Sequence, residues 1–328
     1  MTDAAPLAVV TGASGFVGSH IVDELLLRGA RVRAVVRGSS SRRWLEKKAV
    51  EVADAALDDP QALARAVEGA DWIVHAAGLI RARNAAEFHE ANVVGTERLL
   101  RAADGGKLRR FLFISSQAAA GPSLTGLPVT EDQRPHPVSA YGESKLRAEQ
   151  LVVMAADRLP VSVIRPPAVY GPRDTAILKA FVAGKWHLEP VLRKRGRFSI
   201  VHVSDLVTAV HAALTQEAAV GQVFFACEPD VTDYDELGRS VREALGTWTV
   251  RVAIPQWALA GIAAVAESWA RAAGKAPLLS REKLAEIAAG DWICSSRKIR
   301  ERLGWTPRVG LDEGIRATAD WYREVGWL

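Results

Sequence analysis

The sequence predicts an α/β protein in which a doubly wound parallel sheet carries a smaller, mostly C-terminal substrate lobe. Short apolar, β-branched runs alternate with helical patterns through the first half of the 328 residues. A glycine-rich turn, TGASGFVG at residues 11–18, joins the first such run to the first helical pattern. After Pro172 the alternation weakens into short apolar helices, tryptophan-bearing segments and loops. Right-handed crossovers would wind the alternating part into one sheet with helices on both faces.

The predicted elements follow one another as strand and helix along the chain. The expected strands are residues 7–11, 31–36, 49–54, 72–77, 110–116 and 161–166, with helices near 16–28, 60–67, 87–103 and 140–156. We assign residues 1–172 to a dinucleotide-binding domain, to which part of 198–230 returns. Residues 173–328 form mainly a discontinuous substrate-binding lobe. There is no internal repeat or low-complexity linker, so the two parts should share one core.

The glycine turn has the spacing and context of a phosphate-binding turn. Gly12 would let the chain turn sharply, and Gly15 would let backbone N–H groups approach a pyrophosphate. Gly18 would allow close packing of the helix on the strand. Phe16 and Val17 lie between the last two glycines and belong to the same predicted site. The sequence therefore predicts a Rossmann-type dinucleotide site at the first turn.

The end of the second strand bears on the choice of dinucleotide. Arg37 stands where an NAD-specific protein usually has an acid for the ribose hydroxyls, and Arg42 and Arg43 follow closely. A guanidinium can bind an adenosine 2′-phosphate through two hydrogen bonds, which an acid would repel. We expect NADP as the preferred cofactor, with NAD as the alternative; a solvated basic turn would explain the same residues without a ligand.

The chain resembles the extended branch of the short-chain dehydrogenase/reductase superfamily, which carries TGxxGxxG at its N-terminus. RPPAVYGP at residues 165–172 and FSIVHVSDLVTAV at 198–210 resemble two further segments of the branch, the second with a structural role. LGWTPRVGLDEGI at 303–315 resembles the branch's closing helix. These matches keep the family's order from residue 8 to about residue 323.

A tyrosine and a lysine in VSAYGESKLRAEQ, residues 138–150, are the predicted reaction centre. Tyr141 and Lys145 lie about one helical turn apart on one face. A phenol with a pKa near 10 needs stabilisation of its phenolate to act as a base, and a nearby lysine lowers that pKa. The resemblance implies Ser116 as the hydroxyl that orients the substrate oxygen, and Ser115 as a backbone contact to the cofactor. It also implies that Lys145 binds the nicotinamide ribose.

Further cofactor contacts are implied by the resemblance. Asp54 would accept a hydrogen bond from the adenine amino group, with Ala55 beside it. Ala76, Ala77 and Gly78 end the fourth strand in small residues, which would let the ribose and pyrophosphate lie close.

Four more residues complete the expected site region. Pro166 and Val169 would lie near the nicotinamide ring, and His75 is expected to be a packed strand-end histidine. Asn92 matches the family's asparagine that holds a proton-relay water, and a packing or capping role fits the same position equally well.

The resemblance implies hydride transfer between nicotinamide C4 and an alcohol or ketone. RPPAVYGP, PLLSREKLAEI at 277–287 and Arg37 resemble the 3β-hydroxysteroid dehydrogenase and dihydroflavonol reductase side of the branch, which implies an apolar or steroid-like substrate. A nucleotide-sugar epimerase or dehydratase is the alternative, although Ala168 stands where many epimerases have an asparagine. A non-catalytic NADP-sensing regulator fits less well, because the chain retains Tyr141 and Lys145. Ala120 and Ser204 depart from the family pattern near the substrate lobe.

Composition argues against several other classes. The 42 Lys and Arg are interspersed with 38 Asp and Glu, and the clusters at 37–43 and 193–197 are not interleaved with aromatic residues, so we expect no nucleic-acid partner. Cys227 and Cys294 match no metal-ligand spacing, so we expect no metal; they fit a reducing compartment. The N-terminus lacks the pattern of an export signal, which predicts a cytoplasmic protein.

The most apolar stretch near the end, VAIPQWALAGIAAVA at residues 252–266, is too short to span a bilayer as a helix. A buried helix, a wall of the substrate cleft and a contact with a membrane surface all fit its composition. The resemblance also implies a homodimer, formed through the helices near 87–103 and 140–156.

Overall fold

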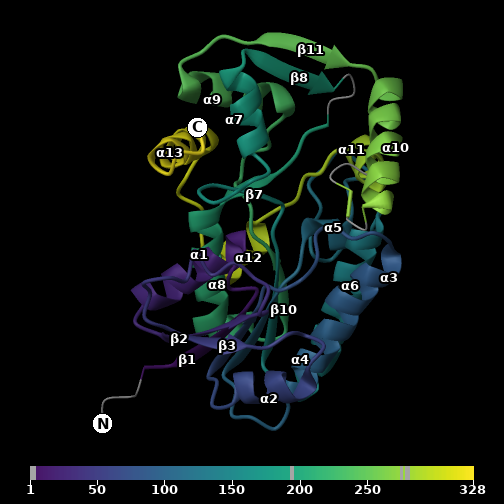
Figure 1. Ribbon diagram of the computed structural model, residues 1–328. Coiled ribbons are helices and arrows are strands. Elements are labelled where there is room, and N and C mark those ends of the chain that lie inside the picture. The colour runs from purple at the N-terminus through teal and green to yellow at the C-terminus, as the bar shows by residue number, and fades with distance from the viewer. Residues whose placement is uncertain (1–4, 193–195, 274–275, 278–280) are drawn as a thin grey trace.

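The central element of the computed structural model is a parallel sheet of seven strands in the order β10-β6-β5-β4-β1-β2-β3 (Figure 1). The structure describes residues 5–192, 196–273, 276–277 and 281–328. The predicted doubly wound fold is confirmed. The seven strands are β1 Leu7–Thr11, β2 Arg31–Val36, β3 Val50–Asp54, β4 Trp72–His75, β5 Arg110–Ile114, β6 Val161–Arg165 and β10 Gln222–Phe225.

Two layers of helices cover the sheet because successive strand residues point to opposite faces. On β1, Ala8 and Val10 pack in one apolar cluster and Val9 packs in the other. The first cluster lies under α1 (Phe16–Leu27) and α8 (Val203–Thr215). The second lies under α2 (Pro60–Val67), α4 (Gly95–Ala103) and α6 (Ala140–Met154).

The helix predicted over residues 87–103 is three consecutive pieces. A short helix, α3 (Ala85–Phe88), continues into the π-helical turn η1 (His89–Val94) and then into α4. A π-helical turn accommodates an extra residue and is frequent at functional sites. Here it contains Asn92, whose side chain is buried.

Two strands end two residues earlier than predicted, because the chain leaves the sheet where the cavity and α5 begin. β4 ends at His75 and the next three residues line a cavity. β5 ends at Ile114, and Ser116 caps the short helix α5 (Gln117–Ala120) with its side chain.

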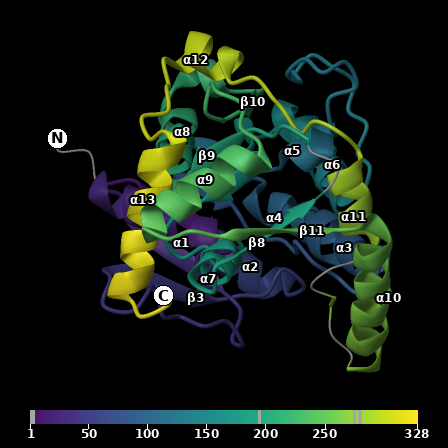
Figure 2. The same cartoon turned by 90° about the horizontal axis from the view of Figure 1, so that it is seen from above.

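The C-terminal lobe, for which the sequence predicts substrate binding, lies over the carboxyl edge of the sheet (Figure 1). One side is an apolar cluster of α7 (Leu178–Lys185), α9 (Tyr234–Leu245) and α13 (Leu311–Glu324), centred on Phe181 and Tyr322. On the other side, α10 (Gln256–Ala272) and α11 (Arg281–Ala288) stand beside α3, α5 and α6 in both views (Figures 1 and 2). The remaining elements are the parallel pairs β7 (Ala168–Tyr170) with β9 (Ile200–His202) and β8 (Leu188–Leu192) with β11 (Val250–Ile254), helix α12 (Arg297–Leu303), and the 3₁₀ turns η2 (Ala155–Asp157) and η3 (Glu217–Ala219).

Helix α10 presents apolar side chains to the solvent. Ile262, Val265 and Trp269, spaced as one helical stripe, are 54%, 70% and 70% exposed, whereas Ala263 and Ala270 are buried. Within the described ranges, no helix is both long enough and apolar enough to cross a membrane.

A buried carboxylate in the HVSDLV segment fastens the C-terminal region to α8. Asp205 Oδ2 accepts hydrogen bonds from the backbone N–H groups of Arg308 and Val309 at 3.0 and 2.9 Å. The Trp305 indole N–H lies 3.2 Å from the Asp205 carbonyl oxygen and 2.9 Å from Thr208 Oγ1. One side chain thus joins segments about a hundred residues apart and sets the approach to α13.

We predict that Asp205→Ala lowers the free energy of unfolding by about 1–3 kcal/mol, because two backbone N–H groups lose their shared, buried acceptor. Urea denaturation of the whole chain measures this. Asp157→Ala, at an exposed acid whose side chain makes no hydrogen bond or ion pair with the described residues, is the control and should stay within about 0.5 kcal/mol of wild type. Equal midpoints for both variants would contradict the role of Asp205.

Candidate active site

The glycine turn brings the end of β1 against the chain that leaves β4. Gly12 has φ +69°, and a Cβ there would lie 2.7 Å from the Ala77 nitrogen. A Cβ on Gly18 would lie 2.1 Å from the Gly12 carbonyl oxygen, so the first turn of α1 packs directly on the loop. Among the described residues, no side chain caps the start of α1 and its first turn carries no acid. The first amide groups of α1 are thus available to an anion.

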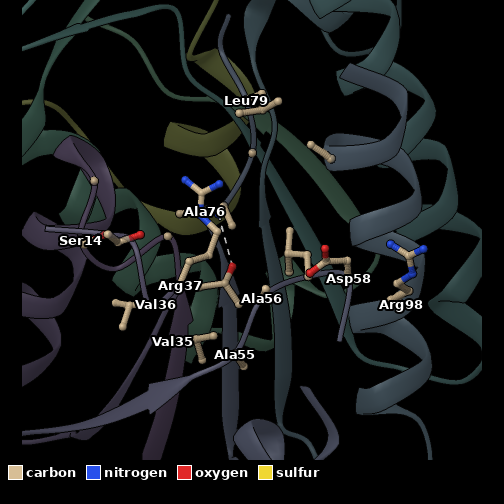
Figure 3. Close-up of a pocket in the computed structure, with 18 of the residues that line it drawn as sticks. Ser14, Val35, Val36, Arg37, Ala55, Ala56, Asp58, Ala76, Leu79 and Arg98 are labelled. Atoms are coloured by element: carbon tan, nitrogen blue, oxygen red, sulfur yellow. Dashed lines mark hydrogen bonds between the residues drawn. The ribbon is translucent and has the colours of Figure 1, made fainter. Parts of the chain in front are cut away.

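A cavity of about 470 Å³ opens beside this turn, at the carboxyl ends of β1, β2, β3 and β4. Figure 3 shows Arg37 on one side of it and Arg98 on the other, with Ala56 and Asp58 between them. Small residues form much of the wall, which leaves room for a flat ligand close to the backbone. The predicted cofactor residues that line the cavity are Gly12, Gly15, Arg37, Ala55, Ala76, Ala77 and Gly78.

Other predicted contacts lie outside this wall. Asp54 is exposed and its carboxylate bonds to the Arg42 guanidinium at 2.5 Å; the aspartate that lines the cavity is Asp58. Phe16, Val17 and Gly18 form the first turn of α1 without lining the cavity. The adenine contact of Asp54 stays a prediction.

Sequence reasoning missed the far wall of the cavity. Glu87, Ala91 and Arg98 all line it from the region of α3, η1 and α4. Their spacings of four and seven residues would place them on one helical face, a signal the sequence does contain. Ser14, Ala56, Leu57, Asp58 and Leu79 were missed as well, being loop residues with no periodic pattern.

The three arginines near the second strand have different surroundings. Arg42 is held by Asp54, and Arg43 stacks its guanidinium on Trp44 at 4.2 Å from the ring centroid. Arg37 is exposed, lines the cavity, and makes no ion pair with any residue the structure describes. Arg37 is therefore the arginine of the three whose charge is available to a ligand in this cavity.

Ser116 and Tyr141 meet where α5 packs on the start of α6. Ser116 Oγ accepts a hydrogen bond from the Ala118 N–H at 3.1 Å, and the Ser116 side chain lies close enough to the Tyr141 hydroxyl to lower its pKa. The close packing depends on Gly142, because a Cβ there would lie 2.4 Å from the Ala118 carbonyl oxygen. The structure thus brings the two predicted catalytic hydroxyls together.

The Tyr141 phenol is held in its neutral form. Burial raises its pKa to about 12, the hydrogen bond with Ser116 acts in the opposite direction, and the Glu286 carboxylate raises the pKa further. The Phe88 ring packs against the Tyr141 ring, with 5.9 Å between the two ring centroids. Glu286, on α11, was not among the predicted site residues.

Lys145 lies one turn after Tyr141, as predicted, but its amine points to the backbone of β5. Lys145 Nζ donates to the Ile114 carbonyl oxygen at 2.6 Å and lies 4.2 Å from the centroid of the Phe113 ring. Burial lowers the pKa of Lys145 to about 7, against the attraction of Glu149. The sequence predicts that Lys145 lowers the pKa of Tyr141, and that role stays a prediction.

Ser115 belongs to a buried network beneath the reaction centre. Its Oγ donates to Glu149 Oε2 at 2.7 Å, and Arg165 Nε donates to the same oxygen at 2.9 Å. The Ser115 N–H donates a hydrogen bond to the Ile164 carbonyl oxygen at 2.8 Å. A backbone contact from Ser115 to a cofactor stays a prediction.

Asn92 clamps the loop after β4 to α6. Its Oδ1 accepts from the Leu79 N–H at 2.7 Å, and its Nδ2 donates to the Leu79 carbonyl oxygen at 3.0 Å and to Ser144 Oγ at 2.9 Å. These contacts match the packing role left open by the sequence. The relay role stays a prediction.

His75 is packed, as the sequence predicts. Its two ring nitrogens bond to Thr11 Oγ1 at 2.7 Å and Thr96 Oγ1 at 2.9 Å, and burial lowers its pKa to about 3.

Pro166 is buried and its carbonyl oxygen accepts from the Gln117 N–H at 2.8 Å, whereas Val169 lies half-buried in β7. The nicotinamide contacts of Pro166 and Val169 stay predictions.

The buried cysteines are not part of this site. Cys227 Sγ lies 3.3 Å from the Cys294 carbonyl oxygen, within a small apolar cluster. In the ranges that the structure describes, no group of three or more His, Cys, Asp or Glu side chains could hold a metal ion.

Known proteins resemble the chain over nearly its whole length. Residues 8–226 match the model of the NAD dependent epimerase/dehydratase family. The ceramide reductase of Caulobacter vibrioides is 32% identical, over 100% of this chain and 98% of the reductase. A 4-hydroxy-2-methyl-3-oxo-4-farnesyl-3,4-dihydroquinoline-1-oxide ketoreductase of Stigmatella aurantiaca is 29% identical over 94% of each chain. The crystal structure of gox2253 is 29% identical, with a TM-score of 0.82 over 98% of this chain and 99% of that one.

The family match covers more than half of the chain, and the reductases resemble it from end to end. The chain therefore belongs to the NAD-dependent epimerase/dehydratase family, as an NAD(P)-dependent enzyme of the extended short-chain dehydrogenase/reductase type.

Proposed function

We propose that the chain transfers a hydride between nicotinamide C4 and an alcohol or ketone substrate at a site made by Ser116, Tyr141 and Lys145. The observation that supports this is the close packing of α5 on the start of α6, which brings Ser116 near Tyr141 at the carboxyl edge of the sheet. Ligands of open α/β sheets bind at this edge.

The residues present suit a nicotinamide dinucleotide. The uncapped start of α1 offers N–H groups to a pyrophosphate, and the walls at Gly12, Ala76 and Gly78 are small enough to admit an adenosine half. A bound nicotinamide supplies or accepts the hydride. The free charge of Arg37 in the cavity supports NADP over NAD.

The protein's own groups handle the substrate oxygen and its proton. Ser116 Oγ would hold the oxygen where charge develops, and Tyr141 would give it a proton during reduction or take one during oxidation. Lys145, fixed to the Ile114 carbonyl, lies close behind the pair and would bind the nicotinamide ribose.

An apolar ketone or alcohol is the proposed substrate. Two relatives are reductases named for ceramide and for a farnesyl-bearing ring, both largely hydrocarbon molecules. A nucleotide-sugar substrate is the alternative that the family description keeps open.

We predict that Tyr141→Phe lowers turnover by about 10²–10⁴-fold, because the substrate oxygen loses its proton donor. Dinucleotide affinity should stay close to wild type, since the phenol lies outside the cavity wall. Nicotinamide absorbance with long-chain ketones, ketosteroids and sugar nucleotides measures turnover.

Tyr234→Phe, at a tyrosine 37% exposed on α9, is the matched control and should leave turnover unchanged. Retained activity in Tyr141→Phe would refute the assignment. Tight dinucleotide binding by wild type without turnover on any of these substrates would favour a cofactor-sensing regulator instead.

We predict that Arg37→Ala weakens NADP(H) binding by about 10–100-fold, because the 2′-phosphate loses its charge-assisted hydrogen bonds with the guanidinium. NAD(H) binding should change little. Calorimetric titration with both dinucleotides checks this, with Arg43→Ala as control because Arg43 stacks on Trp44. Tighter binding of NAD than of NADP by wild type would rule out the preference.

A further inference from the structure

We infer that Trp44, Trp321 and Trp327 are positioning residues that hold the basic turn at residues 37–43 beside the dinucleotide cavity, so that α13 and the residues after it take part in selecting NADP. The inference rests on the proposed binding of a 2′-phosphate by Arg37 and adds the residues that orient this arginine. It comes from ring contacts between segments that are far apart in the sequence.

The basic turn has little structure of its own. The segment between β2 and β3, residues 37–49, contains neither helix nor strand. Its first part, RGSSSRR at 37–43, is polar and exposed apart from Ser40, whose N–H donates to the Arg37 carbonyl oxygen at 2.9 Å. Arg37 and Ser40 both line the cavity. A polar surface loop samples many conformations unless packing restricts it, so the place of Arg37 depends on what anchors this segment.

Trp44 and Leu45 anchor the far end of the turn. The centroid of the Trp44 ring lies 5.7 Å from that of Trp321 and 6.3 Å from that of Trp327. The Trp321 and Trp327 rings also meet edge to face, with 5.2 Å between their centroids. Leu45 is buried in the apolar cluster that lies under α1 and α8. Two successive residues therefore fix the segment, one to the tryptophan rings and the other to the core.

Charged side chains join this anchor to α1. The Arg173 guanidinium lies 5.1 Å from the centroid of the Trp44 ring, and it donates to Ser19 Oγ at 3.0 Å and to Asp23 Oδ2 at 2.7 Å. Lys48, near the end of the segment, also bonds to Asp23. Trp44 thus contacts an arginine that is bound to the helix whose start is proposed to receive the pyrophosphate.

The α13 side of the contact is held firmly. Tyr322 is buried, its hydroxyl donates to the Asp174 carbonyl oxygen, and its ring meets the Phe181 ring edge to face at a centroid distance of 5.4 Å. The Trp327 ring stacks on the Tyr322 ring, with 5.6 Å between centroids. A loop that is already held against such a support loses less conformational freedom when it binds a ligand, which raises its affinity.

Arg43 contacts the same rings, but the anchor does not depend on it. Its guanidinium lies 4.2 Å from the centroid of Trp44 and 5.2 Å from that of Trp327, and the residue is exposed. The tryptophan rings contact one another directly, so they stay together without Arg43.

The test measures the affinities of Trp44→Ala and Trp327→Ala for NADP(H) and NAD(H) by calorimetric titration. We expect NADP(H) to bind about three- to tenfold more weakly to each variant, because the turn must then become ordered on binding. NAD(H) has no 2′-phosphate and should bind within about twofold of its wild-type affinity, which also shows that the variants are folded.

Two further variants separate the rings from general effects of substitution. Trp44→Phe keeps an aromatic ring in the contact and should bind NADP(H) within about twofold of wild type. Trp186→Ala, at a tryptophan 74% exposed at the end of α7, is the matched control and should change neither affinity.

A double variant tests whether the rings act through Arg37. Once Arg37 is alanine, Trp327→Ala should weaken NADP(H) binding no further, because the charge that the rings orient is absent. A second loss of the same size in the double variant would overturn the inference.

A second readout needs no dinucleotide. Trypsin cleaves after lysine and arginine, and residues 37–49 contain five of them: Arg37, Arg42, Arg43, Lys47 and Lys48. Cleavage within this segment, followed by mass spectrometry, should be about fivefold faster in Trp44→Ala and Trp327→Ala than in wild type, because the loop opens more often. Trp186→Ala should be cleaved at the wild-type rate.

Wild-type cleavage and wild-type NADP(H) affinity in both alanine variants would overturn the inference. Faster cleavage without loss of NADP(H) affinity would overturn it as well, and would leave the rings with a structural role. Unchanged NADP(H) affinity in Arg37→Ala would instead overturn the proposed role of Arg37, and this inference with it.

Discussion

A buried ion pair under the catalytic helix is the interaction on which the site depends. Glu149 and Arg165 are each about 95% shielded from solvent and lie 2.5 Å apart, which ties α6 to β6. Ser115 donates to the same carboxylate, so the end of β5 is bound to the pair as well. Loss of either partner would leave an uncompensated charge in the interior. The meeting of Ser116 with Tyr141 is therefore set by charges that touch neither residue.

The parallel topology accounts for much of what could be predicted from the sequence. Residues 7–11 form the predicted strand because they are a mainly apolar, β-branched run buried on both faces. Once the strands are parallel, their carboxyl ends share one edge, and Gly12, Arg37 and Ala76 must converge there. The glycine turn needs only local spacing, so the sequence predicts it fully.

The parts that could not be predicted depend on tertiary packing. The π-helical turn at residues 89–94 has no distinct local pattern; it accommodates Asn92 between Leu79 and Ser144. The orientation of the Lys145 amine depends on a carbonyl of β5, 31 residues away, which helical spacing cannot reveal. Glu286 is still further along the chain, and only the folded lobe brings it to the catalytic helix.

The wall of the dinucleotide cavity is encoded early in the chain. Every residue that lines it lies between Thr11 and Arg98. The groups proposed to handle the substrate's proton lie at 116–145, and the lobe that covers them comes later still. A growing polypeptide therefore leaves the ribosome with the whole wall of this cavity synthesised before Ser116, the first of the hydroxyls proposed to be catalytic.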